Sequence, residues 1–129
     1  MVDFLKFFGV AFVVFLFVDL LWLGIVARKV YKKYLGYIMA EKVRWVPALI
    51  FYVIFIAGLV YFALLPATVW HQALLSGALF GFIAYATYDL TNLSTLKGWP
   101  IQITIIDLVW GTFLGASVST LTFLIISFF

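Results

Sequence analysis

The chain has 129 residues, of which 67% are hydrophobic, while only 8 are Lys or Arg and 5 are Asp or Glu. Soluble domains are about 45–50% apolar and need more polar side chains at their surface than this chain has. A soluble enzyme, a disordered chain and a fibrous repeat are therefore excluded. The chain has no Cys and a single His, His71, so we expect no metal site and no cofactor such as an Fe–S cluster or a bis-His haem. We predict an integral membrane protein, in which the net charge of +3 reflects basic residues beside the membrane and not a nucleic-acid partner.

Four apolar stretches are long enough to cross the hydrocarbon layer as helices, which takes about 20 residues. They cover approximately residues 4–27, 45–65, 72–93 and 101–128. The alternation of apolar and polar residues that is typical of outer-membrane barrel strands does not occur in them, so we predict helices. The expected fold is all-α: a single domain over residues 1–129, with four transmembrane helices in an antiparallel up-and-down bundle.

Basic residues are concentrated in two of the three connections. Residues 28–44 hold six Lys or Arg and residues 94–100 hold Lys97, whereas the other side of the membrane holds only Lys6. Because basic loops stay on the cytoplasmic side, this asymmetry predicts that connections 28–44 and 94–100 are cytoplasmic. Both termini are then external.

The first connection has a helical pattern of its own. Arg28, Lys29, Lys32 and Lys33 recur at helical spacing, with apolar and aromatic residues largely on the other side. This pattern predicts a short amphipathic helix between the first two spans, lying on the cytoplasmic membrane surface. We expect its charges to set the topology and to anchor the chain, and binding of anionic lipid headgroups is the alternative.

Three acidic residues interrupt the apolar spans at a similar depth. Asp19, Asp89 and Asp107 each lie eight to ten residues from the nearest basic residue on the cytoplasmic side, and so does Tyr52. At a rise of about 1.5 Å per residue, all four lie at nearly one level in the cytoplasmic half of the membrane. With their polar and aromatic neighbours at helical spacing they form a predicted ligand-binding layer: Asp19, Trp22, Tyr52, Tyr85, Tyr88, Asp89, Asn92, Thr104, Asp107 and Trp110.

A carboxylate in the middle of a membrane helix costs about 2.5–3.5 kcal/mol on the insertion scale. No Lys, Arg or His lies in this layer to neutralise the three acids. The acids must therefore be protonated, hydrogen-bonded to Tyr, Asn or Trp, or exposed to a cavity filled by water or a ligand. Acids in such settings bind cations, relay protons or act as acid–base catalysts. The alternative is structural, because interhelical hydrogen bonds also hold membrane helices together, at about 0.6 kcal/mol each.

Small residues form a row on each of the last two spans. Gly77 and Gly81 form one G-x-x-x-G motif, and Gly111 and Gly115 form another. Such rows let helix backbones approach closely. We predict that the third and fourth spans pack tightly there, in the external half, which leaves the polar half as a cup open toward the cytoplasm or the inner leaflet.

Five short segments together resemble a known family. They are Asp-Leu-Leu-Trp-Leu-Gly at 19–24, Pro-Ala-Leu-Ile-Phe-Tyr at 47–52, Tyr-Ala-Thr-Tyr-Asp-Leu-Thr-Asn-Leu at 85–93, Trp-Pro at 99–100 and Asp-Leu-Val-Trp-Gly at 107–111. Over essentially the whole chain, the sequence resembles the bacterial family of predicted membrane proteins called domain of unknown function 2177. The resemblance implies four helices and a multi-pass location in the bacterial inner (cytoplasmic) membrane. It implies no activity, so no catalytic residue is assigned.

Three functions agree with these features. We favour binding or transport of a small molecule or lipid in the acidic polar cavity. The expected partners of the protein are membrane lipids. A homo-oligomer would help, because four helices enclose little volume alone. The first alternative, which we favour less, is a membrane enzyme that acts on a lipid or isoprenoid through Asp acid–base groups. The second is a structural partner of a larger membrane complex.

Overall fold

A computed structural model describes residues 2–129, and every regular element within them is helical. The elements are α1 (Val2–Trp22), η1 (Leu23–Ala27), α2 (Arg28–Leu35), α3 (Trp45–Leu59), η2 (Val60–Leu64), α4 (Trp70–Thr95) and α5 (Ile101–Ser127). Four continuous helical stretches are long and apolar enough to cross a membrane: Asp3–Leu35, Trp45–Leu64, Trp70–Thr95 and Ile101–Ser127. The predicted all-α class and the four predicted spans are confirmed.

The first helix is longer than the predicted span. α1 continues through the π-helical segment η1 into α2, so the helix ends at Leu35 and not near residue 27. Lys and Arg are good helix formers, and no Pro interrupts the chain before Gly36. The basic segment is therefore helical as a continuation of the first span. Its placement on the membrane surface stays a prediction.

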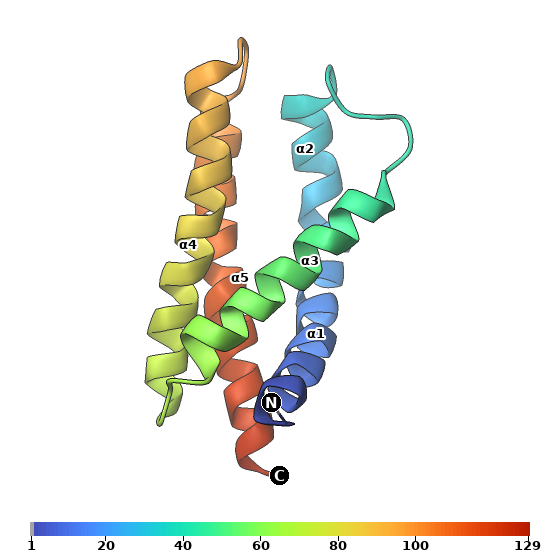
Figure 1. Cartoon of the computed structure of the whole chain (residues 1–129). Coiled ribbons are helices and arrows are strands. Elements are labelled where there is room, and N and C mark those ends of the chain that lie inside the picture. The colour runs from blue at the N-terminus through green and yellow to red at the C-terminus, as the bar shows by residue number, and fades with distance from the viewer. Residues whose placement is uncertain (1) are drawn as a thin grey trace.

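The helices are arranged so that the chain passes four times between the two ends of the molecule (Figure 1). The N- and C-termini lie at one end, while α2 and the turn between α4 and α5 lie at the other. α4 and α5 lie side by side, α1 packs against α5, and α3 crosses the others obliquely. The apolar core joins buried side chains of all four long helices, among them Phe15, Ile56, Leu59, Ala73 and Leu114.

The contact between α4 and α5 depends on glycine. A Cβ atom added at Gly81 would overlap the carbonyl oxygen of Gly111, and one added at Gly115 would overlap that of Gly77. No side chain separates the two backbones at these points, so α4 and α5 form the most closely packed helix pair of the described chain. This pair is the frame on which the polar residues of both helices are held.

This packing makes a stability prediction. Gly81→Leu and Gly115→Leu would each force the two helices apart, so we expect either change to lower the free energy of unfolding by about 1–3 kcal/mol or more. Gly9→Leu is the matched control, because a Cβ atom at Gly9 meets nothing within 4 Å. Thermal unfolding of the purified variants in one detergent measures the difference. Equal destabilisation by all three changes would contradict the packing that we describe.

Candidate functional site

Two carboxyl groups from the closely packed helices lie at the centre of the polar layer. Asp89 on α4 is fully buried, and Asp107 on α5 is only 5% exposed. The two carboxyl groups are close enough to interact directly. Residues 45–96 and 98–129 contain no Lys or Arg, so α3, α4 and α5 supply no permanent cation to compensate the acids. Two carboxyl groups in such a place can share one proton, or they can bind a cation.

Asp89 is the less satisfied member of this pair. Neither of its two oxygens receives a hydrogen bond of normal geometry from the residues that the structure describes, although both are buried. The polar groups close to the Asp89 carboxyl are the carboxyl of Asp107 and the indole of Trp99. Because an unpaired polar group in an apolar interior costs several kcal/mol, such a carboxyl requires a proton or a ligand.

Besides Asp89, Asp107 interacts with a residue that the sequence analysis does not include in the site. The hydroxyl group of Tyr31, on α2, donates a hydrogen bond to Oδ1 of Asp107. The sequence interpretation placed Tyr31 on a separate surface helix, away from the acids. The signal available in the sequence is the absence of Pro between Trp22 and Tyr31, although Gly24 lies there. Only a helix that continues past residue 27 brings Tyr31 to the level of Asp107.

The π-helical segment η1 sets the direction of Tyr31. Tyr31 comes nine positions after Trp22 in the sequence. In a regular α-helix nine positions make about 2.5 turns, which puts the two side chains on opposite sides of the helix. The wider turn of η1 changes this register. As a result, the rings of Trp22 and Tyr31 lie edge to face, with their centroids 6.5 Å apart. Wide turns of this type are frequent at functional sites.

The third acid belongs to a separate hydrogen-bonded pair. Tyr52 on α3 donates a hydrogen bond of 3.3 Å to Oδ2 of Asp19 on α1. Tyr85 lies between this pair and the central acids, near both Asp19 and Asp107. Its ring is held directly against Gly111, where an added Cβ atom would overlap it. One oxygen of Asp19 therefore has a hydrogen-bond donor among the described residues, in contrast to Asp89.

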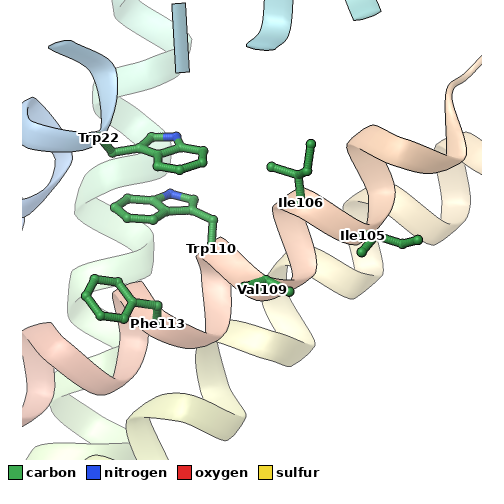
Figure 2. Close-up of a pocket in the computed structure, with 6 residues that line it drawn as sticks. All are labelled: Trp22, Ile105, Ile106, Val109, Trp110 and Phe113. Carbon is green, nitrogen blue, oxygen red and sulfur yellow. The ribbon is translucent and has the colours of Figure 1, made fainter. Parts of the chain in front are cut away.

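Two tryptophans of the predicted polar layer, one on α1 and one on α5, stack on each other. Figure 2 shows Trp22 lying flat against Trp110, with a centroid distance of 4.4 Å and an angle of 9° between the rings. The groove that contains them has a volume of about 450 Å³ and is lined by Trp22, Ile105, Ile106, Val109, Trp110 and Phe113. None of these side chains is acidic or carries a hydroxyl group. We interpret this groove as a lipid-facing surface and the stack as a contact between α1 and α5.

A different groove reaches the acids. It has a volume of about 300 Å³ and is lined by Tyr31, Leu35, Met39, Tyr85, Tyr88, Trp99 and Asp107. A neighbouring groove of about 440 Å³ shares Tyr85 and Tyr88 with it and adds Phe51 and Ala84. Asp107 thus lines a groove beside α2 and α4, and an apolar groove between α3 and α4 adjoins it at Tyr85 and Tyr88.

The remaining predicted residues lie at the margin of this site. Tyr88 is 58% exposed at the rim of the groove, with its ring edge-on to Trp99 at 5.9 Å. Trp99, which we did not predict as a site residue, donates a hydrogen bond of 3.2 Å from Nε1 to the hydroxyl of buried Thr104. Asn92 is half-buried, about one helical turn beyond Tyr88. The structure therefore gathers two groups, one around Asp89 and Asp107 and one around Asp19, and the side chain of Asn92 is close to Tyr88 at the rim of the first.

Four apolar helices that bury a few polar side chains are the features of a multi-pass α-helical membrane protein. The chain belongs to the family of predicted membrane proteins called domain of unknown function 2177, whose family model matches residues 4–124. This confirms the resemblance seen in the sequence. No curated protein and no solved structure matches the chain.

Proposed function

We propose that the protein binds or transports a small molecule or lipid in the groove beside Asp89 and Asp107, in the cytoplasmic half of the membrane. The observation that carries this proposal is the buried carboxyl of Asp89, whose oxygens receive no hydrogen bond, beside a second carboxyl that lines an open groove. Acids that serve only as contacts between helices are satisfied by the protein, as Asp19 is by Tyr52. The central pair is not, and a ligand or a proton completes it.

The proposal includes an orientation. The chain forms an antiparallel up-and-down bundle in a bacterial inner membrane, with external termini and cytoplasmic connections 28–44 and 94–100. This orientation is supported by the charges: the end of the molecule opposite the termini carries seven of the eight basic residues (Figure 1). The two basic connections are also joined, because the hydroxyl of Tyr37 donates a hydrogen bond of 2.5 Å to the carbonyl of Gly98.

Cysteine labelling tests the orientation. The natural chain has no Cys, so a single introduced thiol reports its own position. We expect His71→Cys to react with a membrane-impermeant maleimide added to intact cells. Lys32→Cys and Lys97→Cys should react only after the cells are opened. Labelling of Lys32→Cys in intact cells would overturn the orientation.

Identification of co-purified molecules tests the binding function. The wild type, Asp107→Asn and Asp3→Asn are extracted from the same membranes in lipid nanodiscs, and the retained small molecules and lipids are compared by mass spectrometry. Asp3 is an exposed acid in the first turn of α1 and serves as the control. We expect a molecule enriched in the wild type and in Asp3→Asn but lost from Asp107→Asn. Equal contents in all three samples would contradict the proposal, and a molecule chemically altered by the wild type and Asp3→Asn but not by Asp107→Asn would favour the enzyme alternative.

A further inference from the structure

We infer that the ligand is an amphiphilic organic cation, with a substituted ammonium head beside Asp107 and a hydrocarbon tail between α3 and α4. This inference rests on the proposed function and names the chemical class of its ligand. It follows from three features of the site: the sign of the charge at its base, the aromatic side chains of its walls, and the apolar groove that continues from it.

The charge at the base of the groove is acidic. Asp107 lines the groove, and Asp89 adjoins it from within the protein. A basic residue that could pair with them is absent from α3, α4 and α5. An anionic head would be repelled by the carboxyl pair, whereas a cationic head supplies the missing charge in a place where water screens it poorly. Of the described residues, no Lys or Arg acts on either carboxyl, although α2, which lines the groove through Tyr31 and Leu35, carries exposed basic residues at positions 28, 29, 32 and 33. A ligand with a cationic head would supply the counter-charge that the two carboxyl groups lack.

The walls around Asp107 are aromatic. Tyr31, Tyr85, Tyr88 and Trp99 line the same groove. The ring planes of Tyr88 and Trp99 are nearly perpendicular, at 87° to each other. Aromatic faces attract substituted ammonium groups, which are recognised in proteins by cages of this composition. Metal ions of the Ca²⁺ or Mg²⁺ type prefer several oxygen ligands, and the described residues contain no group of three or more acidic, His or Cys side chains that could hold one.

The continuation of the groove is apolar and open at the side. Phe51 and Ala84 line it together with the two tyrosines that it shares with the acidic groove. The second span packs against α4 mainly through its final part, η2, while α3 diverges from α4 along its length (Figure 1). A hydrocarbon tail can lie in this space with its head beside Asp107. Such a ligand enters from the lipid and not through the closed, glycine-packed half of the bundle.

Titration with a defined probe tests this inference. The full chain is purified in dodecyl maltoside, an uncharged detergent, and titrated with hexyltrimethylammonium by calorimetry and by tryptophan fluorescence. We expect saturable binding of this probe, weaker binding of shorter-chain homologues by up to about four-fold for each methylene removed, and no saturable binding of hexylsulfonate. Equal binding of hexylsulfonate would overturn the inference, because it would show that only the tail is recognised.

Two tyrosines provide a matched pair of variants. Tyr88 at the groove and Tyr61 on η2 are similarly exposed, at 58% and 61%, so replacement of either by Leu leaves the core intact. We expect Tyr88→Leu to weaken binding of hexyltrimethylammonium at least about two-fold, Asp107→Asn to abolish it, and Tyr61→Leu to leave it unchanged. Equal effects of the two tyrosine changes would overturn the inference. If the probe does not bind but Asp107→Asn still loses a co-purified molecule, the ligand class is wrong and the proposed function stands. If the probe does not bind and Asp107→Asn loses no co-purified molecule, the ligand class and the proposed function are both wrong.

Discussion

Replacement of Tyr31 by Phe is expected to destabilise the protein by about 1–3 kcal/mol, because it leaves Oδ1 of Asp107 without its hydrogen-bond donor in a buried place. The ring itself and its edge contact with Trp22 would be retained. Tyr34→Phe is the control, since Tyr34 is a half-buried tyrosine on the same helix whose hydroxyl donates no hydrogen bond to the described residues. Thermal unfolding of the two variants in the same detergent measures the difference.

The comparison of these variants also decides between two positions of the basic helix. If α2 continues the first span, Tyr31 reaches Asp107 and its hydroxyl contributes to stability. A helix that lies flat on the membrane surface would place Tyr31 away from α5. In that case Tyr31→Phe would have no larger effect than Tyr34→Phe, and the surface helix expected from the charge pattern would be the correct arrangement.

The four spans could be predicted from the sequence because a membrane imposes a simple condition. Each crossing needs about 20 apolar residues whose backbone groups are satisfied within the helix, and the chain has four such stretches. Depth could also be predicted, since the rise per residue of a helix is fixed. The sequence distances of Asp89 and Asp107 from Lys97 put the two acids at one level, and their carboxyl groups are adjacent in the structure.

Rotation about the helix axis could not be predicted in the same way. Tyr31 contacts Asp107 because a π-helical turn changes the register of the first helix, and the residues Leu23–Ala27 have no sequence pattern that distinguishes such a turn from regular α-helix. For the same reason, equal depth did not show which acids would meet. Asp19 pairs with Tyr52, while Asp89 and Asp107 interact with each other across the closely packed helices α4 and α5.

The position of Trp99 shows a second limit of prediction from the sequence. Trp99 precedes α5, whose N-cap is Pro100, and its indole reaches Thr104 on the first turns of the helix. In the sequence, a Trp beside a Pro at a helix entry is typical of an interfacial anchor. Its position at the acidic groove depends on how the turn over residues 96–100 folds back, which includes Gly98 with a φ of +74°. Local patterns do not determine that path.

The acids themselves allow the sharpest test of the site. Asp89 and Asp107 adjoin each other without a Lys or Arg on their helices, and two adjacent negative charges in an apolar interior repel strongly. We therefore expect the pair to hold one shared proton at neutral pH when no cation is bound. Infrared spectra of the wild type in a neutral detergent should contain the band of a protonated carboxyl group. Saturation with hexyltrimethylammonium should reduce this band, because the positive head replaces the proton.

Single Asn variants assign the band to its residues. Asp89→Asn or Asp107→Asn leaves one carboxyl beside an amide that can donate a hydrogen bond, so either change removes the reason for the shared proton and should remove the band. Asp19→Asn is the matched comparison, because Asp19 has its own donor in Tyr52, and the band should persist in that variant. Since all three changes preserve side-chain shape, thermal unfolding can establish that each variant is folded. A neutral-pH spectrum without any protonated carboxyl band would show that both acids are ionised, and the central pair would then require a solvated environment that contradicts its burial.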